Sequence, residues 1–311
     1  MNFQELFNPR KTLQLYGLTE NFIFFKNLIK NRKLPKATLV TGNKGIGKFT
    51  LINHLMCSIY DKNNYDENKN IINDGAISKK IINNNFPNVL YLNNSNNNFS
   101  IEQVRELKSI LLKKPFQESE RYVILDDIET LNINSLNALL KTIEEPSKNN
   151  SFVLINNKSK PLLETIKSRC LEIKISLKEN VRKATILSLI KYFDQDIFLN
   201  QDLLSTTPGN FIKLDYIFRK NKIEINDDFL KNFLILLNLY KKEKDIFYKE
   251  SLIFFVDYFM QYKKLKKLYD NKKLIEKRSF LIKNISDFFM LNLNQNSLEA
   301  QRTTAGGWKV G

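Results

Sequence analysis

The chain has 311 residues, 42% of them hydrophobic and 12% aromatic, which suffices for about two or three domains that each bury a core. It contains no run of ~18 uncharged apolar residues and no basic-then-apolar N-terminal segment, so we expect neither a membrane-spanning helix nor a secretory signal. Two cysteines far apart in sequence, Cys57 and Cys170, give neither a disulfide framework nor a zinc cluster, which favours a reduced, cytoplasmic setting.

The formal net charge is +16, from 49 Lys and Arg against 33 Asp and Glu. Such a positive charge favours binding to polyanions, of which nucleic acid is the commonest in a cell. The chain is also crowded with Asn, Lys and Ile, which an AT-rich genome over-supplies, and that bias alone raises the lysine content. The charge therefore supports a nucleic-acid partner without establishing one.

The first part of the chain predicts a helix, a strand, a glycine loop and a second helix. Apolar residues repeat at helical spacing over 20–32, a short apolar run at 37–40 predicts a strand, and the helical pattern resumes over 48–60. The stretch 61–85 is rich in Asn, Asp and Lys and has little periodicity. We expect it to be a partly mobile surface insertion.

Strands and helices alternate from residue 88 to residue 175. The predicted strands are 88–92, 121–125, 151–155 and 171–175. The predicted helices are one that follows a Ser100–Gln103 capping box and ends near Lys114, one at 135–145 that Pro146 stops, and a short one at 162–167. This alternation predicts an α/β fold with a doubly wound parallel sheet.

After residue 176 the strand patterns stop. Helix-length apolar patterns cover 179–193, 227–240, 244–262 and 274–291. We interpret Pro208-Gly209 as a break between two helical units, and we expect the aperiodic segment 301–311 to be disordered. The lysine-rich run 263–267 is either a solvated helix face or a contact for DNA or an acidic partner.

Residues 42–49 match a phosphate-binding loop, G-x-x-x-x-G-K-[ST], at all but one position. The residues that match, with a further glycine inside the loop, are Gly42, Gly45, Gly47 and Lys48. In such a loop, backbone N–H groups surround the phosphates, the lysine reaches the β/γ oxygens, and the final hydroxyl ligates Mg²⁺. A glycine turn with an accidental lysine is the alternative, which the predicted strand before the loop and helix after it disfavour.

Phe49 stands where this pattern requires a hydroxyl, so it cannot ligate a metal. Thr50 is the nearest hydroxyl and is a candidate member of the nucleotide site. It lies about 100° further round the helix, so we expect it not to point at the same metal position.

The strand predicted at 121–125 ends in an acidic pair, Asp126 and Asp127. A hydrophobic strand closed in this way resembles the strand that holds Mg²⁺ through its first carboxylate. In hydrolytic proteins of this kind the second acid is usually Glu, and Asp127 is one methylene shorter. Misplacement by about an ångström can cost on the order of 100-fold in rate. Two aspartates that serve only as turn or cap residues are the alternative.

Residues 137–146 and the triplet Ser168-Arg169-Cys170 closely resemble clamp-loader subunits of the AAA+ superfamily, which place a sliding clamp on primed DNA. Within that family, residues 8–17 and 34–37 resemble the delta-prime type of subunit. The resemblance covers roughly residues 8–210. It implies that Arg169 is an arginine finger, supplied in trans to the ATP of a neighbouring subunit. A surface arginine at a helix end is the alternative.

The resemblance also implies an arrangement of domains and partners. It implies an AAA+ P-loop domain over 1–175, a helical lid over 176–215, a helical collar over 216–300 and a tail over 301–311. The chain would be an end-member of a hetero-pentameric ring with gamma/tau-type and delta-type subunits. It would meet the sliding clamp and primer-template DNA through that complex, in the bacterial cytoplasm at the nucleoid and away from membranes.

Three departures from the hydrolysing family members point the same way. Phe49 removes the metal ligand, Asp127 replaces a Glu, and Asn210 stands where hydrolysing relatives place a phosphate-sensing arginine after a glycine. We therefore expect no intrinsic ATPase activity and either weak ATP or ADP binding or none. Two alternatives stay open: an ATP-hydrolysing motor subunit or other AAA+ ATPase of DNA metabolism, and a nucleotide-binding structural subunit without turnover.

Some delta-prime subunits carry a cysteine-ligated zinc site after the phosphate-loop helix. Here only Cys57 falls in that region, so we expect no zinc and a small, buried, apolar role for this cysteine. His54 is the sole histidine and has no Cys or His cluster around it, so we expect no role as a metal ligand.

Overall fold

The computed structural model describes residues 7–72, 75–93, 101–116, 119–194, 196–199, 206–223, 229–265 and 270–291. The expectations for Ser100 and for the segment 301–311 lie outside these residues. The described chain divides into two compact units, of which one ends at Lys178 and the other begins at Glu179.

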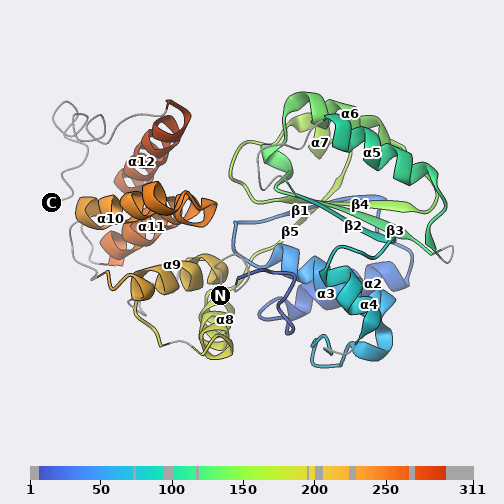
Figure 1. Cartoon of the computed structure of the whole chain (residues 1–311), viewed down its shortest axis with the longest axis horizontal. Helices are drawn as coiled ribbons and strands as arrows, with labels where there is room; N and C mark the ends of the chain where they lie inside the picture. The colour runs from blue at the N-terminus through green and yellow to red at the C-terminus, as the bar shows by residue number, and fades with distance from the viewer. Residues whose placement is uncertain are drawn as a thin grey trace. The chain divides into compact units, whose positions relative to one another are not determined.

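The first unit is built on a five-stranded sheet whose strands all run parallel, in the order β2-β3-β4-β1-β5. The strands are β1 (Ala37–Thr41), β2 (Val89–Asn93), β3 (Arg121–Asp126), β4 (Asn150–Asn156) and β5 (Leu171–Lys174). One face is covered by α2 (Thr19–Lys30), α3 (Lys48–Tyr60) and α4 (Ala76–Ile82), and the other by α5 (Ile101–Leu112), α6 (Ile133–Glu144) and α7 (Glu164–Lys167) (Figure 1). The predicted doubly wound α/β fold is confirmed.

The sheet separates two apolar clusters because successive side chains of a strand point to opposite faces. In β3, Ile124 packs with the buried residues of α2 and α3, whereas Val123 and Leu125 pack on the other face with those of α5 and α6. Strands covered by helices on both faces are apolar along their whole length. These segments could therefore be predicted as strands from continuous apolar runs, although apolar and polar residues do not alternate in them.

The register of the sheet brings the carboxyl ends of its central strands to one edge. Thr41 of β1 is aligned with Asn156 of β4 and with Lys174 of β5, and Leu125 of β3 is aligned with Leu154 of β4. The segments that follow β1, β3 and β4 therefore lie next to one another. In open α/β sheets this edge is where ligands bind.

The segment 61–85 differs from the expected mobile insertion, because its described residues are packed against the first unit. It contains η1 (Lys62–Asn64) and α4, and it buries Ile71 and Ile81, which are 3% and 0% exposed. Asp61 accepts a hydrogen bond from the backbone N–H of Ser78 at 2.8 Å, which ties the start of the segment to α4. Short elements with few apolar residues give little periodicity even when those residues are buried.

The second unit is helical. Its helices are α8 (Glu179–Tyr192), α9 (Pro208–Lys220), α10 (Phe229–Glu243), α11 (Ile246–Leu265) and α12 (Asn271–Leu291). Helix α9 packs against α8 and α11, and α10 and α12 pack against α11. Within this core the rings of Phe218 and Phe255 are stacked with centroids 5.6 Å apart. None of the described helices in either unit is long and apolar enough to cross a membrane.

Pro208-Gly209, interpreted as a break between two helical units, begins a helix that follows α8 and does not interrupt one. Pro208 is the first residue of α9, where its missing N–H costs nothing, since the first N–H groups of a helix have no intrahelical partner. The expected junction at 215/216 lies inside this helix.

Candidate phosphate-binding site and exposed arginine

The loop between β1 and α3 has the backbone of a phosphate cradle. Gly45 and Gly47 adopt φ of 83° and 98°, the left-handed region that favours glycine and in which successive N–H groups form an anion-binding concavity. Gly42 is needed for a different reason, because a Cβ at this position would lie 2.6 Å from the backbone oxygen of Ile175. The three glycines of the sequence motif therefore each have a backbone reason to be there.

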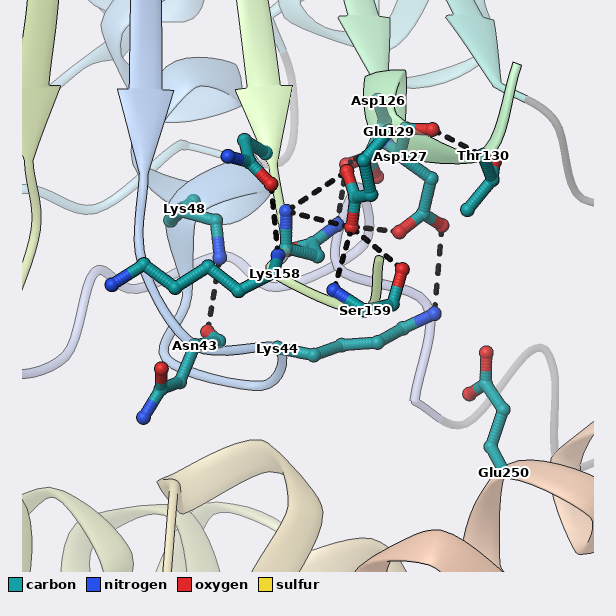
Figure 2. Close-up of polar contacts among 12 residues, drawn as sticks. Asn43, Lys44, Lys48, Asp126, Asp127, Glu129, Thr130, Lys158, Ser159 and Glu250 are labelled. Atoms are coloured by element: carbon teal, nitrogen blue, oxygen red, sulfur yellow. Dashed lines mark hydrogen bonds and ion pairs between the residues drawn. The ribbon is translucent and has the colours of Figure 1, made fainter. Parts of the chain in front are cut away.

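Lys48, at the start of α3, points its ammonium back into the loop (Figure 2). Its Nζ donates to the backbone oxygens of Gly42, at 2.6 Å, and Asn43, at 2.9 Å. Burial lowers the pKa of Lys48 from 10.5 to about 8, although the negative charge of Asp126 opposes this. The lysine is 2% exposed and still mainly a cation at neutral pH, as a phosphate-binding lysine must be.

Phe49 packs its ring against the apolar cluster that includes Tyr91 and the buried residues of α3. The ring lies 5.1 Å, centroid to centroid, from the ring of Tyr91 on β2. The guanidinium carbon of Arg10 lies 5.4 Å from the Phe49 ring and 4.7 Å from the Tyr91 ring. Thr50 follows in the first turn of α3.

The acidic pair at the end of β3 is bridged by an amide from the end of β4. Nδ2 of Asn157 donates to Oδ1 of Asp126 at 3.0 Å and to Oδ1 of Asp127 at 2.7 Å. The backbone N–H of Asp127 also donates to Oδ1 of Asp126, at 2.9 Å. Burial, and then the charge of Asp127, raises the pKa of Asp126 from 3.8 to about 6. The first carboxylate is thus engaged by N–H donors.

Two further groups fix the surroundings of the pair (Figure 2). Lys44 of the loop forms an ion pair with Oδ2 of Asp127 at 3.5 Å. Glu129, which is 7% exposed, accepts hydrogen bonds from the backbone N–H groups of Asn157 and Ser159 and from the Ser159 hydroxyl, at 3.1, 3.0 and 2.7 Å. This buried carboxylate holds the chain after β4 in the shape that places the Asn157 amide.

The triplet Ser168-Arg169-Cys170 forms the turn between α7 and β5. Cys170 packs against the apolar cluster of α5 and α6, and burial raises the pKa of its thiol to about 11. Arg169 is 32% exposed, and its Nη1 donates to the backbone oxygen of Thr165 at 3.1 Å. The cysteine thus fixes the turn and leaves the arginine at the surface.

The family described as DNA polymerase III, delta subunit, matches residues 18–179, just over half of the chain. The matched region contains the phosphate loop, the acidic pair and the Ser-Arg-Cys turn. The chain belongs to this family of clamp-loader subunits. The resemblance drawn from residues 137–146 and 168–170 is confirmed at that level.

Individual relatives carry more than one subunit name. The gamma subunit of Buchnera aphidicola is 26% identical over 195 residues, which cover 62% of this chain and 52% of the relative. The delta' subunit of Pseudomonas aeruginosa is 39% identical over 72 residues, 23% of this chain and 22% of the relative. The chain thus matches between about a fifth and half of the length of these relatives. A DNA polymerase III gamma subunit-related protein from Thermotoga maritima aligns at 17% identity with a TM-score of 0.48, covering 92% of this chain and 98% of that one.

The residues of this clamp-loader chain fit a phosphate group and do not fit Mg²⁺. The glycine conformations and the Lys48 ammonium suit an anion. The metal, by contrast, would need a hydroxyl at the position of Phe49, and one oxygen of Asp126, Oδ1, already accepts two N–H donors. In the described part of the chain, no three His, Cys, Asp or Glu side chains are grouped to hold a metal ion.

Three other residues singled out in the sequence belong to the second unit or are buried in the first. Asn210 lies in the first turn of α9, in the second unit. Cys57 is fully buried, as expected of a small apolar side chain, and burial raises its thiol pKa to about 12. His54 is buried between Tyr65 and the backbone oxygen of Thr12.

Sequence reasoning missed three residues of the site: Arg10, Glu129 and Asn157. For Asn157 a signal existed, since it follows a buried strand whose carboxyl end meets those of β1 and β3. Glu129 lies two residues beyond the acidic pair, but its partners come from a different segment. Arg10 reaches Phe49 across 39 positions of sequence, and no spacing rule predicts such a contact.

Proposed function

We propose that this chain is a delta-prime-type clamp-loader subunit that stands at the end of a ring and donates Arg169 to the ATP site of its neighbour. The observation that carries the proposal is a contrast between two sites. The Ser-Arg-Cys turn keeps its sequence and presents its arginine at the surface, whereas the chain's own loop has Phe49 packed where a metal ligand is required.

The partners that follow are gamma/tau-type and delta-type subunits in a hetero-pentamer. The sliding clamp and primer-template DNA would be met through that complex, in the cytoplasm of a bacterium at its nucleoid. The helical unit would supply a lid formed by α8 and α9 and a collar that begins at α10. The chain would then be a component of a DNA-directed DNA polymerase holoenzyme.

The geometry of the acidic pair favours this role over that of an ATP-hydrolysing motor. Relatives include both gamma and delta' subunits, so their names do not decide between the two. In this chain the second acid, Asp127, accepts a hydrogen bond from Asn157 and forms an ion pair with Lys44, and these partners compete with a water that the carboxylate would orient towards a γ-phosphate. We therefore expect no intrinsic ATPase activity.

The decisive experiment is a reconstituted clamp loader that contains Arg169→Ala. Arginine fingers contribute ~10³–10⁵ in kcat in other systems, so DNA- and clamp-stimulated ATP hydrolysis by the neighbouring subunit should fall steeply. Lys167→Ala is the matched control, because Lys167 is an exposed cation two positions away that pairs only with Glu164 of its own helix among the ion pairs described. Full ATPase activity with Arg169→Ala would show that the arginine has been assigned wrongly.

A second measurement distinguishes the proposed role from that of an ATP-hydrolysing motor subunit. The purified chain by itself should show no steady-state ATP hydrolysis in the presence of Mg²⁺. Robust Mg²⁺-dependent turnover, lost in Lys48→Ala, would make the chain a motor subunit instead.

A further inference from the structure

Strand β2 lies at one end of the sheet, so one side of its backbone has no neighbouring strand in the described part of the chain. On the other side, the N–H of Tyr122 in β3 donates to the oxygen of Asn88 at 2.9 Å, and backbone groups alternate in direction along a strand. The N–H and C=O groups of Val89, Tyr91 and Asn93 therefore point away from β3. Such groups form a template on which another strand can pair.

The sequence of β2, Val-Leu-Tyr-Leu-Asn, makes this edge suited to pairing. Its first four residues are aliphatic or aromatic, and none of the five is charged. The strand at the opposite end of the sheet, β5, is four residues long and carries the exposed charged residues Glu172 and Lys174, which discourage the addition of a strand. Because β2 lacks such charges, its edge needs another form of protection.

The side chain of Asn84 occupies the β2 edge. Its Oδ1 accepts a hydrogen bond from the N–H of Tyr91 at 3.2 Å, and its Nδ2 donates to the backbone oxygen of Tyr91 at 3.4 Å. The N–H of Val89 donates to the backbone oxygen of Phe86 at 3.1 Å. The outward N–H groups of Val89 and Tyr91 are thus both paired within the chain, and one side-chain amide serves both groups at the centre of the strand.

The turn after α4 explains why this residue is an asparagine. Asn84 has a φ of 58°, in the left-handed region. Its N–H donates to the oxygen of Ile81 at 3.0 Å, and the next N–H donates to that of Lys80 at 2.8 Å, which is the pattern of a Schellman motif at a helix end. Glycine and asparagine both suit this position, but only asparagine has a side-chain amide. The same residue therefore ends α4 and covers the edge of β2.

We propose that Asn84 closes the β2 edge against a second copy of this chain, whose own β2 would otherwise pair with it. An uncharged strand offers no charge that would select a different partner, and two identical edges can pair about a two-fold axis, each supplying donors and acceptors to the other. The edge is accessible, since Asn84 itself is exposed. This inference is independent of Arg169, so its failure would leave the proposed function intact.

The test is sedimentation velocity of the full chain over a wide range of protein concentration. Asn84→Gly keeps the left-handed turn and removes the amide, so this variant should form dimers at concentrations where the unmodified chain does not. Asn85→Gly is the matched control, because Asn85 is an exposed asparagine in the same turn and does not contact Tyr91 in the hydrogen bonds described. Identical association of the two variants at every concentration would overturn the proposal.

Amide hydrogen exchange locates the effect. At low concentration Asn84→Gly should raise the exchange rate of the Tyr91 amide by about two- to tenfold, as expected for the loss of one hydrogen bond, and dimerisation should protect this amide again. Dimers that leave the Tyr91 amide unprotected would contradict pairing through β2.

A comparison within the unmodified chain decides the matter even if a variant fails to fold. The N–H of Glu172 lies on the outer edge of β5, because the N–H of Ile175 donates towards β1 and the direction alternates along the strand. After correction for intrinsic rates, the Tyr91 amide should exchange more slowly than the Glu172 amide. Equal rates would show that Asn84 does not close the edge.

Discussion

The Nε of Arg169 lies 3.0 Å from Oε2 of Glu144, which joins the turn after α7 to the end of α6. Both residues belong to the motifs that identify the family, yet they lie 25 positions apart. Glu144 is 50% exposed and Arg169 32%, so water screens the pair. Exposed pairs of this kind contribute about 0–1 kcal/mol. The carboxylate thus orients the arginine and can release it at little cost.

The first prediction concerns that release. If Arg169 acts in trans as proposed, it must leave Glu144 before it can reach a neighbour's phosphate. Glu144→Gln should therefore leave the neighbour's ATPase activity unchanged or raise it by up to about fivefold, the equivalent of ~1 kcal/mol. Steady-state ATP hydrolysis by the reconstituted ring is the measurement, with Glu145→Gln, also exposed, as the control. A loss as large as that from Arg169→Ala would mean that Glu144 is required to place the finger.

The second prediction is the titration of His54, the sole histidine. Its Nε2 contacts the Thr12 oxygen at 2.9 Å and its Nδ1 the Tyr65 hydroxyl at 3.1 Å, an arrangement that suits the neutral ring, and burial lowers its pKa from 6.5 to about 4. Since the unfolded chain binds the proton first, the free energy of unfolding should fall as pH drops from about 6.5 towards 4. One resolved histidine resonance in an NMR titration measures this pKa directly; a midpoint near 6.5 would place the ring in water.

The third prediction concerns the amide that bridges the acidic pair. Asn157→Asp would put a third carboxylate against Asp126, whose pKa is already raised to about 6. The folded state would then hold protons that the unfolded state releases, so the loss of unfolding free energy should be small near about pH 4 and should grow as pH rises through about 6. Urea unfolding across this range is the measurement. Asn157→Ala, which adds no charge, should lack most of this dependence.

The fourth prediction tests the close approach at Gly42. Gly42→Ala would bring a methyl group within 2.6 Å of the Ile175 oxygen, and backbone must move to relieve the contact. We expect a loss of about 1–3 kcal/mol in the free energy of unfolding, as for overpacked cores. Urea unfolding of the variant is the measurement. An unchanged unfolding midpoint would show that the backbone at Ile175 moves to accommodate the methyl group at no cost.

Much of the fold could be predicted because the elements that build the sheet are continuous in sequence. Helix α3 begins and ends where its pattern does, since the phosphate loop fixes its start and its apolar face continues to Tyr60. Helix α9 was missed because a proline and a glycine, read as a break, also suit a helix start.

The residues of the candidate site that belong to short sequence motifs could be predicted, whereas those that reach it from distant segments could not. Lys48 and Asp126 were predicted from local motifs, and Arg169 from the resemblance of residues 168–170 to clamp-loader subunits. Arg10 and Asn157 are defined by their contacts with segments that only the folded sheet brings near, at distances of 4.7 Å to Tyr91 and 3.0 Å to Asp126. Contacts between residues so far apart in the sequence leave no signal in the local sequence pattern around either residue.

The packing of Phe49 has a consequence for how the chain could change over time. Its ring supports Tyr91 and carries the guanidinium of Arg10, so a codon change that restored a hydroxyl would also remove one side of that stack. The resulting protein would have a metal ligand beside an unsupported arginine and an acid already bound by an amide. If the chain is the non-hydrolysing subunit proposed above, a single substitution at Phe49 would not restore hydrolysis, because the hydroxyl and the acidic pair would have to change together.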